Sequence, residues 1–121
     1  MTAGVPASTG WRALLAALVL AICWLAFSPH PPTAVDTSWD KLNHLSAFTA
    51  LALCAERAFG GPAWRRSALA LLGFGVVIEL VQSQIPGRSA EAADVLADAV
   101  GIAAGLLLAA AWRYSRRHFR R

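Results

Sequence analysis

The chain has 121 residues, a length that allows one domain at most. Hydrophobic residues make up 57% of it and charged residues only 15%, a composition too apolar for a soluble domain of this size. The formal net charge is +4, but the basic residues flank apolar segments and no nucleic-acid-binding motif accompanies them, so nucleic acid is not an expected partner. Cys23 and Cys54 lie inside apolar segments and are interpreted as packing residues.

Four segments are predicted to be membrane-spanning helices, at about residues 11–27, 41–59, 67–85 and 91–112. A cleaved signal peptide is the rival interpretation of the first, but bulky Trp24 and Phe27 stand where cleavage would occur, so we expect an uncleaved span. Loops this short make neighbouring helices antiparallel. The sequence therefore predicts one all-α domain over residues 1–121, a four-helix transmembrane bundle that ends in a basic cytoplasmic tail at residues 113–121.

Charges alternate between the two sides of this predicted bundle. Nine of the eleven basic residues fall on the side of the termini: Arg12, Arg57, Arg65, Arg66, Arg113, Arg116, Arg117, Arg120 and Arg121. The other side holds Lys41 and Arg88 together with six of the seven acids: Asp36, Asp40, Glu79, Glu91, Asp94 and Asp98. By the positive-inside rule, both termini are predicted to be cytoplasmic, in a protein of the bacterial inner membrane.

Polar residues gather where the second and third spans approach the outer side. Asp40, Lys41 and His44 fall around the first turn of the second span. An imidazole inside a span suits proton transfer or polar recognition, whereas placement at the membrane interface without a function is the alternative, which fits Lys41 better than His44. Glu79 lies about two turns from the end of the third span, where an acid facing lipid is costly, so we expect it to face the protein interior. Gly75 and Gln82 lie on the same helical stripe as Glu79. A purely structural ion pair is the alternative for Glu79.

The last span carries Asp94, Asp98, Gly101 and Gly105 at intervals that place them on one helix face. The two glycines form a GxxxG motif, which favours close packing against the second or third span. The two acids lie one turn apart near the outer side, where a basic residue would compensate their charge. Arg88 is interpreted either as such a counter-ion or as a clamp for an anionic headgroup.

These motifs, in this order, resemble the VanZ-like family of small bacterial membrane proteins. The resemblance covers about residues 36–111 and rests on Asp40-Lys41-Leu42-Asn43-His44, Glu79-Leu80-Val81-Gln82, Pro86-Gly87-Arg88, and Asp94 with Gly101 and Gly105. The family usually has Asn at the position of Asp98, so this chain adds a charge there. The resemblance implies a cell-envelope protein, and the name-giving member of the family is linked to low-level resistance to the glycopeptide antibiotic teicoplanin.

The outer polar residues are predicted to form one outward-facing pocket, because helical rise places His44, Glu79 and Asp94 within about 10 Å of the same membrane depth. These three are the candidate catalytic residues, and the candidate binding residues are Asp40, Lys41, Gln82, Arg88 and Asp98. Expected partners are membrane lipids and an envelope lipid or lipid-linked ligand that the pocket recognises or modifies. No cofactor is expected. A His/Asp/Glu metal site is chemically possible, but the spacing matches no standard signature, so no metal is expected. A non-catalytic structural or interaction protein and a small proton-linked transporter are the alternatives.

Overall fold

All regular elements in the computed structural model are helices. It describes residues 7–29, 40–88 and 90–120. The elements are α1 (Ala7–Phe27), α2 (Asp40–Phe59), the short 3-10 helix η1 (Gly61–Ala63), α3 (Trp64–Gln82) and α4 (Ala92–His118). The predicted all-α fold with four helices is therefore confirmed over the described residues.

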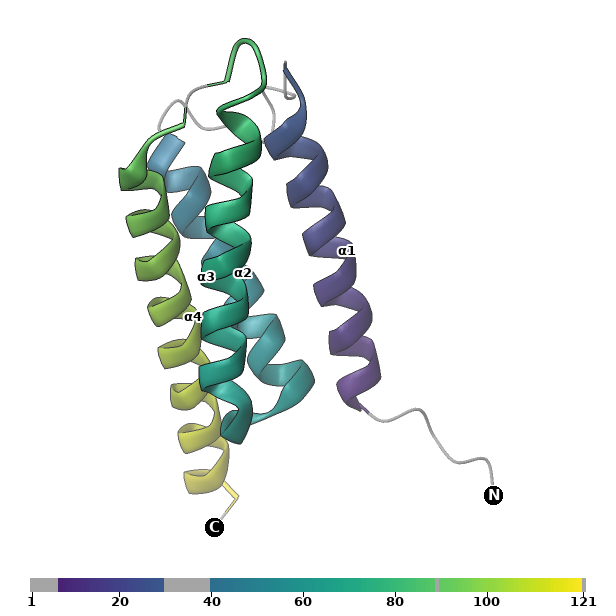
Figure 1. Cartoon of the computed structure of the whole chain (residues 1–121). Coiled ribbons are helices and arrows are strands. Elements are labelled where there is room, and N and C mark those ends of the chain that lie inside the picture. The colour runs from purple at the N-terminus through teal and green to yellow at the C-terminus, as the bar shows by residue number, and fades with distance from the viewer. Residues whose placement is uncertain (1–6, 30–39, 89, 121) are drawn as a thin grey trace.

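The helices lie side by side in one bundle (Figure 1). α2 packs most extensively on α4, α3 lies against both, and α1 contacts α2 and α3. One end of the bundle, called the polar end here, holds the first turns of α2 and α4 and the last turn of α3. The opposite end, called the basic end, holds the start of α1 and the end of α4. The polar and basic residues separated along the sequence are thus separated in space.

Several helix boundaries differ from those predicted, since α1 begins at Ala7, α3 runs from Trp64 to Gln82 and α4 ends at His118. α3 ends at Gln82 because the chain turns at once through Pro86 and Gly87, whose φ of 84° suits glycine. α4 instead runs to His118 and so includes most of the segment expected as a tail. No glycine or proline interrupts it there, and its last turn is basic, which complements the negative end of the helix dipole.

Two of the described helical segments, Ser8–Phe27 and Ala92–His118, are long and apolar enough to cross a membrane, judged by length and composition. α2 and α3 do not reach the same standard. α2 carries charged residues near both ends, and α3 starts at a pair of arginines and contains Glu79. The four predicted spans are thus all helices, of which α1 and α4 alone have the character of a membrane span within the described chain.

The close packing of α4 on α2 depends on the GxxxG glycines. A methyl group built at Gly101 would lie 2.6 Å from the carbonyl oxygen of Leu45, and one built at Gly105 would meet the carbonyl oxygen of Thr49. Both oxygens belong to the α2 backbone, so a side chain at either glycine would force the helices apart. Between the two ends the interior is apolar, with Phe48, Leu51 and other buried side chains at its centre.

The basic end is held by contacts of arginine side chains. Arg113 of α4 forms an ion pair with Glu56 of α2, which is buried. The guanidinium of Arg57 lies over the rings of Trp11 and Trp112, at 5.6 and 5.3 Å from their centroids, which joins α1, α2 and α4. The ion pair with Arg113 compensates the charge of the buried Glu56 at this end of the bundle.

Candidate functional site

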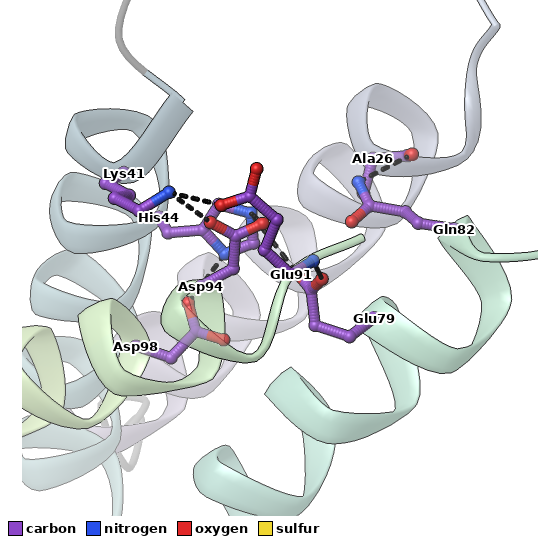
Figure 2. Close-up of polar contacts among 8 residues, drawn as sticks. All are labelled: Ala26, Lys41, His44, Glu79, Gln82, Glu91, Asp94 and Asp98. Carbon is purple, nitrogen blue, oxygen red and sulfur yellow. Dashed lines mark hydrogen bonds and ion pairs between the residues drawn. The ribbon is translucent and has the colours of Figure 1, made fainter. Parts of the chain in front are cut away.

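His44, one turn into α2, is surrounded by carboxylates from α3 and α4 (Figure 2). Its Nδ1 lies 2.8 Å from Asp98 Oδ1, its Nε2 lies 3.5 Å from Glu79 Oε1, and the same Nε2 lies 3.8 Å from Asp94 Oδ2. The imidazole is only about 10% exposed, and both aspartates are fully buried. Residues far apart in the sequence thus meet in one cluster, which we call the His44 cluster: His44, Glu79, Asp94 and Asp98.

The contact with Asp98 decides how the imidazole presents its other nitrogen. An ionised carboxylate only accepts hydrogen bonds, so with Asp98 ionised the proton of this contact belongs to Nδ1, and the Nδ1–H donates a hydrogen bond to Asp98 Oδ1. Nε2 then points toward Glu79 and Asp94. Its distances to them exceed the roughly 2.7–2.9 Å of a charge-assisted hydrogen bond. The two nitrogens of His44 therefore have different environments.

Local structure fixes the acids of the cluster. Glu79 lies on the buried face of α3, in line with Gly75, and its Oε2 accepts a hydrogen bond of 3.0 Å from the backbone N–H of Glu91. Gly75 makes room for Asp98, because a methyl group there would collide with that carboxylate. Asp94 and Asp98, four residues apart, point from the same face of α4 toward α2.

A basic residue lies at the outer edge of the cluster. The ammonium group of Lys41 is 2.8 Å from Glu91 Oε2 and 3.5 Å from Asp94 Oδ1. The side chains of Lys41 and Glu91 are 32% and 56% exposed, so their ion pair lies at the surface above the buried groups. Among the described residues, the predicted pocket residues His44, Glu79, Asp94 and Asp98 form a buried cluster, with the Lys41–Glu91 pair at its boundary. Lys41 supplies the compensating charge that the sequence predicted for it or for Arg88.

Some acidic oxygens in the cluster lack hydrogen-bond donors. Neither carboxylate oxygen of Asp94 has a hydrogen-bond partner among the described residues, and the same is true of Glu79 Oε1. All three atoms are buried, and a buried carboxylate without donors is costly. The cluster is therefore incomplete as a purely internal network, which favours a bound group that the oxygens contact.

Three of the predicted binding residues are not placed in the cluster. Gln82 turns away from it and donates a hydrogen bond of 3.1 Å to the carbonyl oxygen of Ala26, which joins α3 to α1. Arg88 follows α3 in the turn and makes no ion pair with a residue that the structure describes. Asp40 begins α2, but its side chain lies outside the described part of the chain.

Two contributors were not singled out from the sequence. Glu91 was counted only as an outer acid, yet its backbone N–H binds Glu79 and its carboxylate binds Lys41. It precedes α4 and belongs to no periodic pattern, so helical spacing gives no signal for it. Gly75 was noted as part of a stripe with Glu79, and the stripe does lie on the buried face of α3.

Comparison with protein families gives one match. A family model described as VanZ/LLP1 matches residues 14–113, which include all four helices in whole or in part. No curated protein and no solved structure matches the chain. The matched region contains the whole His44 cluster and both GxxxG glycines.

Proposed function

The chain belongs to the VanZ/LLP1 family, and on that premise we propose that it is a multi-pass protein of the bacterial cytoplasmic membrane whose polar end recognises or modifies a cell-envelope lipid or lipid-linked molecule. The observation that carries this proposal is the His44 cluster. It gathers an imidazole and three carboxylates at one end of an otherwise apolar bundle, with buried oxygens that lack donors. The family match and the two apolar helices support a membrane location.

The ligand that suits this cluster presents hydrogen-bond donors. Asp94 and Glu79 offer acceptor oxygens, which the hydroxyl groups of a sugar or the amine of a headgroup would satisfy. Entry of such a group would displace the exposed Lys41–Glu91 ion pair, which contributes little stability because it is largely solvated. A lipid-linked molecule would keep its apolar part against the bundle while its polar part reaches the cluster.

For catalysis, His44 and Glu79 are the candidates for proton transfer, since they lie 3.5 Å apart and are shielded from water. Among the described residues no nucleophile is evident near them: Ser46, two residues after His44 in α2, is exposed. The proposal therefore covers recognition and modification. A non-catalytic interaction protein would keep the cluster only for helix packing.

A transporter is disfavoured by the middle of the bundle. The polar end and the Glu56–Arg113 pair at the basic end are separated by buried apolar residues, among them Leu51 and Leu71. A proton path would need polar groups or water along this stretch. The described core supplies apolar side chains there.

The test compares envelope composition in a deletion strain with that in complemented strains. Lipids and cell-wall precursors are profiled after complementation with the wild type, with Glu79→Gln or with His44→Ala. A matched control is His118→Ala, which removes an exposed imidazole from the basic end. We expect deletion to change at least one lipid or lipid-linked precursor, and only the wild type and the control to restore it.

Protein amounts in the membrane are measured in parallel, so that loss of protein is distinguished from loss of function. The proposal fails if deletion leaves the profile unchanged, or if Glu79→Gln and His44→Ala restore it fully. Because the resemblance links the family to teicoplanin, susceptibility to that antibiotic is measured in the same strains. A susceptibility change that follows the lipid profile across the variants would connect the cluster to the antibiotic.

A further inference from the structure

His44, Glu79 and Asp94 each aim one potential ligand atom at the same point. The three atoms, a ring nitrogen and two carboxylate oxygens, all lie within 4.8 Å of one another. Nε2 of His44 is 3.5 Å from Glu79 Oε1 and 3.8 Å from Asp94 Oδ2. Around a tetrahedral ion with ligand bonds of about 2.0–2.1 Å, neighbouring ligand atoms are about 3.3 Å apart. The two distances from the histidine nitrogen, 3.5 and 3.8 Å, are close to that value and longer than those of good hydrogen bonds.

From this arrangement, the geometry points to a binding site for one divalent transition-metal ion such as Zn²⁺, held by His44, Glu79 and Asp94. The inference goes beyond the proposed function but uses the same oxygens of Glu79 and Asp94. With the ion bound, a recognised molecule would reach the ion through one of its own oxygen atoms instead of donating hydrogen bonds to these carboxylates. A histidine with two carboxylates is a ligand set used by ions of this class, whereas the hard ions Ca²⁺ and Mg²⁺ prefer oxygen ligands alone. Three protein ligands also leave a position open for water or for an oxygen of a bound molecule.

The contact between His44 and Asp98 is the second observation in favour of a metal. Histidines that bind metals commonly donate their other N–H to a carboxylate, which fixes the ring and makes the ligating nitrogen more basic. Here Nδ1 donates to Asp98 Oδ1 at 2.8 Å, and Nε2 is left facing the other two acids. Glu79 is oriented in the same way, because its second oxygen accepts the N–H of Glu91. Both ligands are therefore positioned by groups outside the site.

Charge and hydrogen bonding favour the same conclusion. When ionised, Glu79, Asp94 and Asp98 bring three negative charges to a buried volume, and Lys41 is shared with Glu91. A divalent cation would balance these charges and contact the buried oxygens of Asp94 and Glu79 that have no hydrogen-bond donor. The competing explanation is a doubly protonated His44. That proton would still leave His44 Nε2 3.8 Å from Asp94 Oδ2, too far for a good hydrogen bond, so Asp94 would still depend on its ion pair with Lys41.

Sequence spacing could not indicate this site. Its ligands come from three different helices, α2, α3 and α4, and no two of them are near each other in the chain. The expectation of no metal rested on the absence of a local signature, which a site assembled from separate helices does not leave.

The test is a direct count of bound metal in the full chain. The protein is purified in detergent, stripped with a chelator, equilibrated with Zn²⁺, freed of unbound ion and analysed by mass spectrometry for zinc per chain. We expect one zinc per wild-type chain, loss of it in His44→Ala and Glu79→Gln, and retention in His118→Ala, which controls for binding at an exposed imidazole. Asp98→Ala, which removes the acceptor of the His44 Nδ1–H, should weaken zinc affinity by about 10–100-fold, as loss of an outer-shell partner does.

Two further measurements keep the result decisive. Circular dichroism and gel filtration show whether each variant is folded. Replacement of Zn²⁺ by Co²⁺ in the wild type gives a visible spectrum that reports nitrogen and oxygen coordination, even if His44→Ala does not fold. The inference is overturned if the wild type retains no more zinc than Glu79→Gln does. It is also overturned if the His118→Ala variant loses the bound zinc. The two proposals can also fail separately. If the wild type binds zinc through the cluster but the Glu79→Gln variant still restores the envelope profile, the metal site is supported and the proposed function is not.

Discussion

Lys41 is the residue that joins the surface of the polar end to its buried acids. Its ammonium group lies 2.8 Å from Glu91 and 3.5 Å from Asp94, and only Asp94 is fully buried. We predict that Lys41→Met, which keeps the length of the side chain, lowers the free energy of unfolding by more than the loss of a fully exposed ion pair would, since Glu91 is solvated but Asp94 is not. Thermal unfolding in detergent measures the loss.

The matched control for Lys41→Met is Glu91→Gln. It breaks the exposed pair but leaves Lys41 beside Asp94, so the loss should be clearly smaller. Equal losses in the two variants would mean that Asp94 does not depend on Lys41 for its compensating charge.

Asp98 adds an acid where the VanZ-like family usually has Asn, and the structure shows what either residue would do. A side-chain oxygen at this position accepts the Nδ1–H of His44, and an amide oxygen can do the same. We therefore predict that Asp98→Asn leaves metal-stripped protein as stable as the wild type or more stable, because one of three neighbouring buried charges is removed. Asp98→Ala should be less stable than both, because it leaves the Nδ1–H without this acceptor. The order of the three melting temperatures checks the argument, and Asp98→Asn melting as low as Asp98→Ala would contradict it.

The contact between α2 and α4 is the element-level feature on which the cluster depends. It brings His44 of α2 against Asp94 and Asp98 of α4, and it requires Gly101, whose position leaves no space for a side chain. We predict that Gly101→Ala lowers the free energy of unfolding by about 1–3 kcal/mol, the usual cost of overpacking. The obstructing atom is a backbone oxygen, which cannot move without its helix. Thermal stability in detergent is the measurement.

Gly73 offers a control of the same chemistry on α3. A methyl group there meets nothing within 4 Å, so Gly73→Ala should be neutral or slightly stabilising through the higher helix propensity of alanine. If Gly101→Ala were as stable as Gly73→Ala, the close approach of α4 to α2 would not hold in the folded protein.

Helical periodicity explains which parts of this arrangement could be predicted from the sequence. It gives the depth of a residue along the bundle, and so it anticipates that His44, Glu79 and Asp94 lie at one level. Rotation about the axis is harder to predict: Glu79 and Gln82 share a stripe but differ in direction by about 60°. That difference is enough to turn Gln82 toward α1 while Glu79 faces α2 and α4. The role of Glu91 depends on the turn after α3, for which the sequence has no repeating pattern.

The arrangement of charge over the whole molecule leads to the last prediction, which concerns its orientation. The start of α1 and the end of α4 lie together at the basic end, where Arg12, Arg57 and Arg113 make their contacts. The His44 cluster lies at the opposite end. Because basic flanking residues are retained on the cytoplasmic side of bacterial membranes, we predict that both termini are cytoplasmic and that the polar end faces outward.

Reporter fusions test this orientation. Green fluorescent protein joined after Arg121 should fluoresce, since it folds in the cytoplasm, whereas alkaline phosphatase inserted within residues 31–37 should be active, since it needs the periplasm. The reciprocal pair, alkaline phosphatase after Arg121 and green fluorescent protein within residues 31–37, serves as the control and should be inactive. An active reciprocal pair would place the His44 cluster at the cytoplasmic face. The ligand would then have to be a cytoplasmic or inner-leaflet molecule, whereas the metal site, which depends only on contacts within the bundle, would be unaffected.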